Sequence, residues 1–117
     1  NAMEQYALFA FNGDPMCFVH VLLHTLDMNS SGYDVKLVIE GSATKLVKDL
    51  QDPNAPFAEL YKEVKEGGLI DCVCRACSNK MGSLESAEAQ GLPVGGELKG
   101  HPSMSAYIDK GYTIVTF

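Results

Sequence analysis

Short apolar runs alternate with helical segments along this chain, and this alternation restricts the possible folds more than any other feature. The first run, residues 5–11, is almost continuously apolar, which is typical of a strand covered on both faces. Strands and helices that alternate at this spacing imply right-handed crossovers between parallel strands. We therefore expect an α/β fold, a three-layer α/β/α sandwich with a mainly parallel sheet of about five strands.

Residues that start and stop helices bound the expected elements. Asp14 is a good N-cap and Pro15 a good first helical residue, while Gly67-Gly68 ends a later helix. Between residues 92 and 98, proline and glycine permit only a short strand. The predicted strands cover residues 5–11, 33–39, 69–75, 92–98 and 112–117, and the predicted helices cover 15–28, 42–50, 56–66, 78–90 and 102–110.

The length of 117 residues predicts one domain, which we place at residues 3–117. Asn1 and Ala2 precede a methionine and are typical of a cloning scar. The chain does not begin with a basic segment followed by an apolar core, and its apolar stretches are too short to span a bilayer. We therefore expect a cytoplasmic protein whose four cysteines are reduced thiols.

The net charge of −6 disfavours nucleic acid as a partner, because surfaces that bind phosphate backbones are rich in lysine and arginine. The nine basic residues are scattered and form no run. The Gly-x-Gly-x-x-Gly pattern of dinucleotide enzymes, the P-loop and the Gly-x-Ser-x-Gly elbow are absent from the sequence. We expect no nucleic acid, no membrane partner and no cofactor.

Open parallel sheets bind ligands outside the carboxyl ends of their strands, which makes three turns candidates: residues 12–14, 40–42 and 76–78. Cys77 should lie where the third strand meets the next helix. A helix N-terminus and the nearby basic residues would favour its thiolate form. Cys77 should then be the most reactive of the four thiols, although an inert, half-buried cysteine remains the open alternative.

The spacing of Cys72, Cys74 and Cys77, together with His101, suggests a zinc or iron–sulfur site. Residues two apart on an extended strand, however, are about 6.6 Å apart at Cα. Two thiolates on one zinc approach to about 3.8 Å. A regular strand therefore opposes chelation by both Cys72 and Cys74, and we predict that these two are buried, reduced and metal-free.

The helix predicted at 15–28 carries His20, His24 and Asp27 on one face, a spacing that could ligate a metal. The glutamate that follows the first histidine in metalloproteases is missing, because Val21 stands there. We favour a polar stripe at a wet edge or subunit contact. The helix is apolar on more faces than one sheet can cover, which predicts a symmetric oligomer.

Four segments in order resemble the DsrE/DsrF-like proteins, small α/β domains associated with sulfur relay, and together they span nearly the whole chain. They are Asn12-Gly13-Asp14-Pro15, the strand from Tyr33-Asp34-Val35 to Gly41, the segment Arg75 to Gly82 around Cys77, and the ending from Gly100-His101-Pro102-Ser103 through Lys110 to Phe117. The resemblance implies a homotrimer or homohexamer. It also implies that Cys77 accepts and passes on sulfane sulfur as a persulfide.

Two functions are compatible with these observations. In the first, the protein is a sulfur carrier that receives sulfur from a donor protein on Cys77 and hands it to an acceptor thiol, with Asn79 stabilising the thiolate and His101 moving a proton. In the second, it is a non-catalytic oligomeric module that binds a small anion or metabolite at the strand ends. The binding residues would then be Gly13, Asp14, Ser42 and Ser78, with Cys77 in the wall of the pocket.

Overall fold

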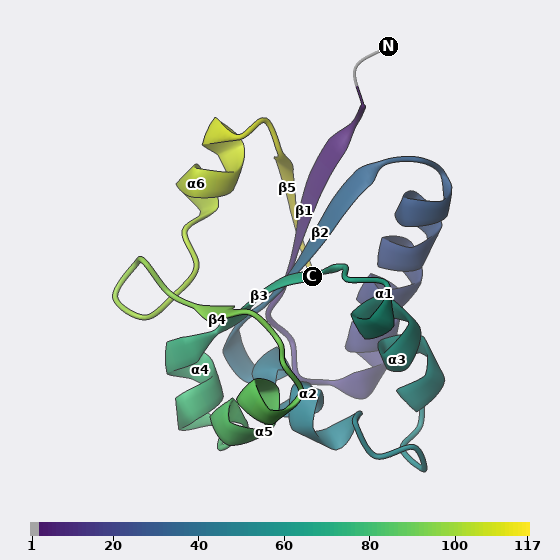
Figure 1. Cartoon of the computed structure of the whole chain (residues 1–117), viewed down its shortest axis with the longest axis vertical. Coiled ribbons are helices and arrows are strands. Elements are labelled where there is room, and N and C mark those ends of the chain that lie inside the picture. Colours follow the sequence, from purple (N-terminus) through teal and green to yellow (C-terminus); the bar gives the residue numbers. More distant parts are fainter. Residues whose placement is uncertain (1–2) are drawn as a thin grey trace.

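The computed structural model describes residues 3–117 and contains a five-stranded sheet (Figure 1). Asn1 and Ala2, which we interpret as a cloning scar, lie outside the described residues. The order of strands across the sheet is β4-β3-β2-β1-β5, and every neighbouring pair is parallel. This confirms the predicted α/β class. The strands are β1 (Gln5–Ala10), β2 (Asp34–Ile39), β3 (Ile70–Cys74), β4 (Val94–Gly95) and β5 (Thr113–Thr116).

Helices connect these strands along the described chain: α1 (Pro15–Ser30), the short 3-10 helix η1 (Gly41–Thr44), α2 (Lys45–Asp49), α3 (Ala58–Glu66), α4 (Arg75–Lys80), α5 (Leu84–Ala89) and α6 (Met104–Asp109). The predicted single helix at 78–90 is wrong. Two short helices replace it, because Gly82 adopts a left-handed conformation with φ of 74° that ends the first of them. The first helix also starts at Arg75, so Cys77 lies inside its opening turn.

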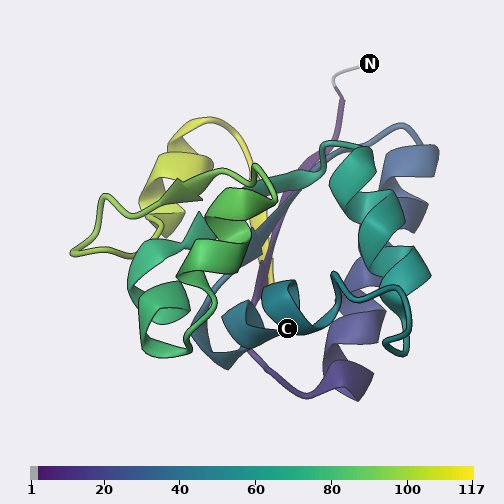
Figure 2. The same ribbon diagram turned by 60° about the horizontal axis from the view of Figure 1, so that its bottom comes forward.

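Helices cover both faces of the sheet, as predicted, but very unequally. Helices α1 and α3 lie on the side of the sheet opposite α6 (Figures 1 and 2). The larger core lies under α1, α2, α3 and α5, with buried Phe18, Leu22, Leu46, Tyr61, Val64 and Ala87 against the strands. The smaller core joins Ala7, Phe9, Val38, Tyr107 and Tyr112 under α6 and the segment that follows it.

Helix α1 buries most of its apolar surface within its own chain. Phe18, Val21 and Leu22 are buried, whereas Met16 and Leu23 are 61% and 46% exposed. The histidines and Asp27 of the polar stripe are exposed to solvent. Among residues 3–117, no helix combines the length and apolar composition needed to cross a membrane.

Candidate functional site

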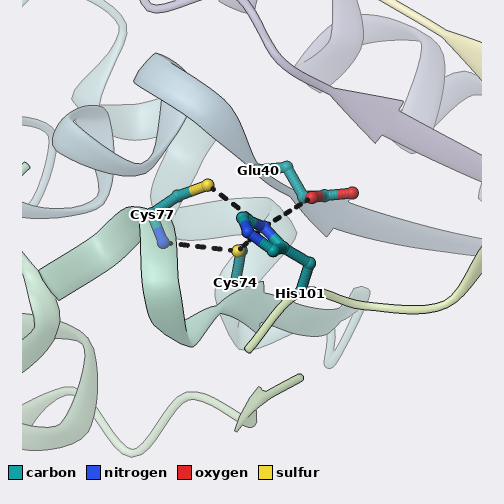
Figure 3. Close-up of side chains that lie close together, drawn as sticks. All are labelled: Glu40, Cys74, Cys77 and His101. Atoms are coloured by element: carbon teal, nitrogen blue, oxygen red, sulfur yellow. Dashed lines mark hydrogen bonds and ion pairs between the residues drawn. The ribbon is translucent and has the colours of Figure 1, made fainter. Parts of the chain in front are cut away.

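Four side chains from three segments converge at the carboxyl edge of the sheet: Glu40, Cys74, Cys77 and His101 (Figure 3). Glu40 directly follows β2, Cys74 ends β3, Cys77 lies in α4, and His101 comes from the loop between β4 and α6. One ligand atom of each side chain lies within 4.8 Å of those of the other three. We call these four residues the thiol cluster.

The junction of β3 and α4 places two thiols side by side. Cys74 is the last residue of β3 and the N-cap of α4, and its extended backbone turns the chain into the helix. The Cys77 backbone N–H donates to Cys74 Sγ at 3.4 Å, so a thiol takes the place of the usual capping oxygen. The sequence predicts Cys77 at this junction, but the junction residue is Cys74, which is fully buried. Cys77 follows in the first turn of α4 and is half-buried.

A tight hairpin in the loop after β4 brings His101 to the thiols. Leu98 and His101 exchange two backbone hydrogen bonds of 2.8 and 2.9 Å across a turn whose central residues, Lys99 and Gly100, have φ of 51° and 91°. Positive φ at both positions is the geometry of a type I′ turn. The Ala76 N–H donates to Gly100 O at 3.0 Å, which ties the hairpin to the start of α4.

Glycine is required in this hairpin because its backbone segments touch. A Cβ on Gly96 would overlap the backbone of Gly100, and a Cβ on Gly100 would lie 3.0 Å from the Ala76 Cβ. The Gly100 N–H also donates to Gly96 O at 3.2 Å. Two glycines therefore determine how closely His101 approaches α4.

Nδ1 of His101 lies at the centre of the thiol cluster. It is 3.1 Å from Cys74 Sγ, 3.6 Å from Cys77 Sγ and 3.5 Å from Glu40 Oε1. A neutral imidazole nitrogen either donates or accepts a proton, so one tautomer can accept from a thiol and the other can donate to the carboxylate. Proton exchange among these groups therefore needs no large movement.

Burial favours the neutral, protonated forms of Glu40 and Cys74 in the cluster. Glu40 is only 7% exposed, and loss of solvation raises its pKa, an effect that the attraction of His101 partly offsets. Burial also raises the pKa of the Cys74 thiol, which keeps its proton and lies 3.5 Å from Gly100 O. Without a bound cation, Cys74 is therefore a poor nucleophile at neutral pH.

Cys72 differs from the prediction, because it is only half-buried. Its side chain packs against the smaller core under α6 and lines a cavity of about 220 Å³ with Asp71, Val94 and Tyr107. Burial, assisted by the nearby Asp71 carboxylate, raises the pKa of the Cys72 thiol to about 11. Cys72 lies outside the thiol cluster.

Three of the expected binding residues belong to a different corner of the same edge, formed by the turns after β1 and β2. The Gly13 N–H donates to Ser42 Oγ at 2.9 Å, and the Ser42 hydroxyl donates to Phe11 O at 3.2 Å. Asp14 accepts from the Met16 N–H and caps α1. We call Gly13, Asp14 and Ser42 the serine corner; its polar groups are occupied in holding the turns.

The two expected residues after Cys77 do not join the cluster. Ser78 is fully buried, and within residues 3–117 its hydroxyl has no hydrogen-bond partner. Asn79 is exposed, and no hydrogen bond in the described part of the chain joins its side chain to Cys77.

The sequence does not predict Glu40 as a site residue, and it predicts Cys74 as a core residue although the cysteine spacing suggests a metal site. Two signals pointed toward them: Glu40 belongs to one of the three candidate turns, and Cys74 forms a Cys-x-x-Cys pair with Cys77 across a strand end. Strand alternation predicts a core position for Cys74, but Cys74 is the last residue of β3 and also caps α4, so its side chain faces the site.

Comparison with known proteins places this chain among small proteins of similar sequence. The model of the DsrE/DsrF-like family matches residues 7–117. An uncharacterized protein of Methanocaldococcus jannaschii is 32% identical over 97 residues, which are 83% of this chain and 77% of that protein. An uncharacterized protein of Archaeoglobus fulgidus is 46% identical over 41 residues, 35% of this chain and 67% of its own length. A conserved protein of unknown function from Bacteroides thetaiotaomicron has the same fold, with a TM-score of 0.68 and 17% identity over the full length of both chains.

Proposed function

The chain belongs to the DsrE/DsrF-like family, which is linked to sulfur relay, and from this premise we propose that it is a sulfur carrier whose Cys77 holds a persulfide. One observation carries the proposal: the half-buried Cys77 Sγ lies 3.6 Å from His101 Nδ1. A thiol beside an imidazole has both the nucleophile and the proton acceptor that sulfur transfer needs.

The transfer is an exchange reaction between the Cys77 thiol and the persulfide of a donor. Cys77 passes its proton to His101, and its thiolate attacks the outer sulfur of a donor persulfide. The sulfur–sulfur bond of the donor breaks, a new one forms on Cys77, and the donor sulfur leaves as a thiolate that takes the proton back. The products are a Cys77 persulfide and a donor thiol, so no oxidant or reductant is consumed.

Delivery repeats the same chemistry in the other direction. An acceptor thiolate attacks the outer sulfur of the Cys77 persulfide, and Cys77 leaves as the thiolate. Both partners must reach the sulfur atom, which suits the partly exposed Cys77 and not the buried Cys74. The donor and the acceptor are therefore thiol-bearing partners that dock at the carboxyl edge of the sheet.

We also propose that this carrier is a cytoplasmic homotrimer or homohexamer, since members of the family are often oligomeric. The exposed Met16 and Leu23 of α1 offer apolar area for a subunit contact. Light scattering should give a mass of three or six chains, and a monomer mass across micromolar concentrations would contradict the assembly.

The alternative, a binding module for a small anion or metabolite, has less support. The N–H of Gly13 donates to Ser42 Oγ, the hydroxyl of Ser42 donates to Phe11 O, and Asp14 caps α1. A ligand there would have to displace these hydrogen bonds.

Mass spectrometry after incubation with a low-molecular-weight persulfide tests the carrier. We expect the reduced protein to gain the mass of one sulfur atom, and peptide mapping to place it on Cys77. Cys77→Ser should abolish the gain, whereas the matched variants Cys72→Ser and Cys17→Ser should retain it. Sulfur that persists in Cys77→Ser, or an unmodified wild-type thiol, would contradict the proposal.

A further inference from the structure

We propose that the thiol cluster is a binding site for one thiophilic divalent cation, with Zn²⁺ as the fitting ion and Cys74, Cys77, His101 and Glu40 as its ligands. Two sulfurs, one ring nitrogen and one carboxylate oxygen offer one ligand atom each. This inference shares Cys77 and His101 with the proposed sulfur carrier, but it does not depend on the carrier being correct.

Two of the three distances from His101 Nδ1 to the other ligand atoms match the edges of a zinc tetrahedron. Zinc bonds of about 2.3 Å to sulfur and about 2.0–2.1 Å to nitrogen and oxygen place sulfur and nitrogen about 3.6 Å apart, and nitrogen and oxygen about 3.4 Å apart. His101 Nδ1 lies 3.6 Å from Cys77 Sγ and 3.5 Å from Glu40 Oε1. Its 3.1 Å contact with Cys74 Sγ must lengthen, and the ligand atoms of the other pairs lie within 4.8 Å of one another.

The strand end removes the geometric obstacle to chelation by two cysteines, so this proposal replaces our prediction that Cys74 is metal-free. Cys72 and Cys74 are separated by an extended strand, which holds their sulfurs too far apart for one zinc. Cys74 and Cys77 instead span the last strand residue and the first helical turn, and the Cys77 N–H already contacts Cys74 Sγ at 3.4 Å. A Cys-x-x-Cys pair in such a turn has the spacing of zinc sites.

The chemistry of the ligand atoms selects the class of metal. Calcium and magnesium require shells made of oxygen, whereas thiolates and imidazole suit zinc, a borderline-soft ion without a strong geometric preference. The fully buried Cys74 and the nearly buried Glu40 also gain from a cation, because it compensates the negative charge that burial disfavours. Binding should release the thiol protons.

The site is held in place by the chain itself. The glycine hairpin positions His101, and the helix cap positions the two cysteines. The His101 side chain is 43% exposed, which leaves a path for the ion to enter and leave. A zinc-bound Cys77 thiolate is not available for sulfur, and zinc would therefore compete with loading of sulfane sulfur.

Cobalt uptake tests the site directly. Reduced, chelator-treated full-length protein should bind one Co²⁺ per chain with a thiolate-to-cobalt charge-transfer band and the visible bands of tetrahedral cobalt, and Zn²⁺ should displace it. The band scales with the number of bound thiolates, so Cys74→Ser and Cys77→Ser should each weaken it by half or more, while the matched variants Cys72→Ser and Cys17→Ser should keep it at full intensity. Glu40→Gln should weaken Co²⁺ binding by at least about 10-fold, because loss of even an outer-shell partner of a ligand typically costs that much.

Absence of the charge-transfer band in the wild type, or an undiminished band in either Cys74→Ser or Cys77→Ser, would overturn the proposal. Alkylation mapping of the wild type covers the case in which a variant fails to fold. Zinc should protect Cys77 but not the exposed Cys17, and equal labelling of Cys77 with and without zinc would also overturn it. Failure of the metal site leaves the sulfur adduct on Cys77 unaffected, and failure of sulfur loading leaves the cobalt spectrum unaffected, so the two proposals fail separately.

Discussion

The thiol cluster and the serine corner lie at the same carboxyl edge of one parallel sheet, yet they use their polar groups in opposite ways. In the serine corner, the Gly13 N–H, Ser42 hydroxyl and Asp14 carboxylate bond to neighbouring backbone and side chains. In the thiol cluster, two thiols and a carboxylate surround one histidine nitrogen. Residues at the carboxyl end of a strand can therefore form a site, but they can react or bind only where their polar groups are not already used to hold the backbone.

Close approach of the backbone distinguishes the two regions. A Cβ on Gly13 would lie 2.6 Å from the Ser42 carbonyl oxygen, so the two turns of the serine corner are packed against each other. In the thiol cluster, the closely packed backbone belongs to the hairpin around Gly96 and Gly100, and it delivers a side chain, His101, to the site. The absence of a side chain on glycine therefore allows the turns of the serine corner to pack together, and it allows the hairpin to bring His101 to the thiol cluster.

Gly96→Ala should have the largest effect. The added Cβ would overlap Gly100, so the hairpin must move and carry His101 away from Cys77. We expect sulfur loading on Cys77 to slow by about 100-fold, the usual loss when a general base is displaced. The matched variant Gly95→Ala, whose Cβ would lie 3.4 Å from Cys72 Sγ, should load normally. Equal loading rates in the two variants would show that His101 is not needed.

Gly13→Ala should damage stability and leave the chemistry intact. Overpacking against the Ser42 carbonyl should lower the free energy of unfolding by about 2 kcal/mol. Under conditions in which the variant remains folded, sulfur loading on Cys77 should match that of the wild type. Urea unfolding monitored by circular dichroism gives the first quantity and mass spectrometry the second. A slower loading rate in folded Gly13→Ala would show that the two corners are coupled.

The two serines provide a finer comparison. Ser42→Ala removes hydrogen bonds to Gly13 and Phe11 and should cost about 1 kcal/mol of unfolding free energy. Ser78→Ala should be close to neutral or slightly stabilising, because the buried Ser78 hydroxyl has no partner within residues 3–117. Urea unfolding of both variants checks the difference. A larger loss in Ser78→Ala than in Ser42→Ala would mean that the Ser78 hydroxyl is bonded in solution.

Asp34→Asn, at the opposite edge of the sheet, should give the smallest change in the free energy of unfolding. Hydrogen bonds from Tyr112 and Gln5 lower the pKa of Asp34 below its ordinary value of 3.8. The ionised form therefore stabilises the fold above pH 3.8, and this contribution is lost as pH falls through the lower folded pKa. Asp34→Asn should lose less stability than the wild type on acidification in urea unfolding, while the exposed control Asp109→Asn should follow the wild type.

Local signals account for the parts of the fold that the sequence predicted. The cap at Asp14-Pro15 predicted the start of α1, and the apolar runs predicted the four longer strands to within a few residues. The parallel arrangement followed from alternation alone, because a right-handed crossover is nearly the only way to join such elements. The predicted long helix at 78–90 failed where Gly82 turned the backbone, since propensity does not reveal which glycine adopts a positive φ.

The sequence by itself therefore determined the α/β sheet, the carboxyl edge as the place for chemistry, and Cys77 as the thiol to test. Tertiary structure alone decided that Cys74 and Glu40 join it and that Gly13, Asp14 and Ser42 do not. It also decided that His101, 24 positions from Cys77, reaches both thiols. The physical reason is that caps and periodicity act over a few residues, whereas the convergence of three segments depends on two crossovers and on backbone contacts at Gly96 and Gly100.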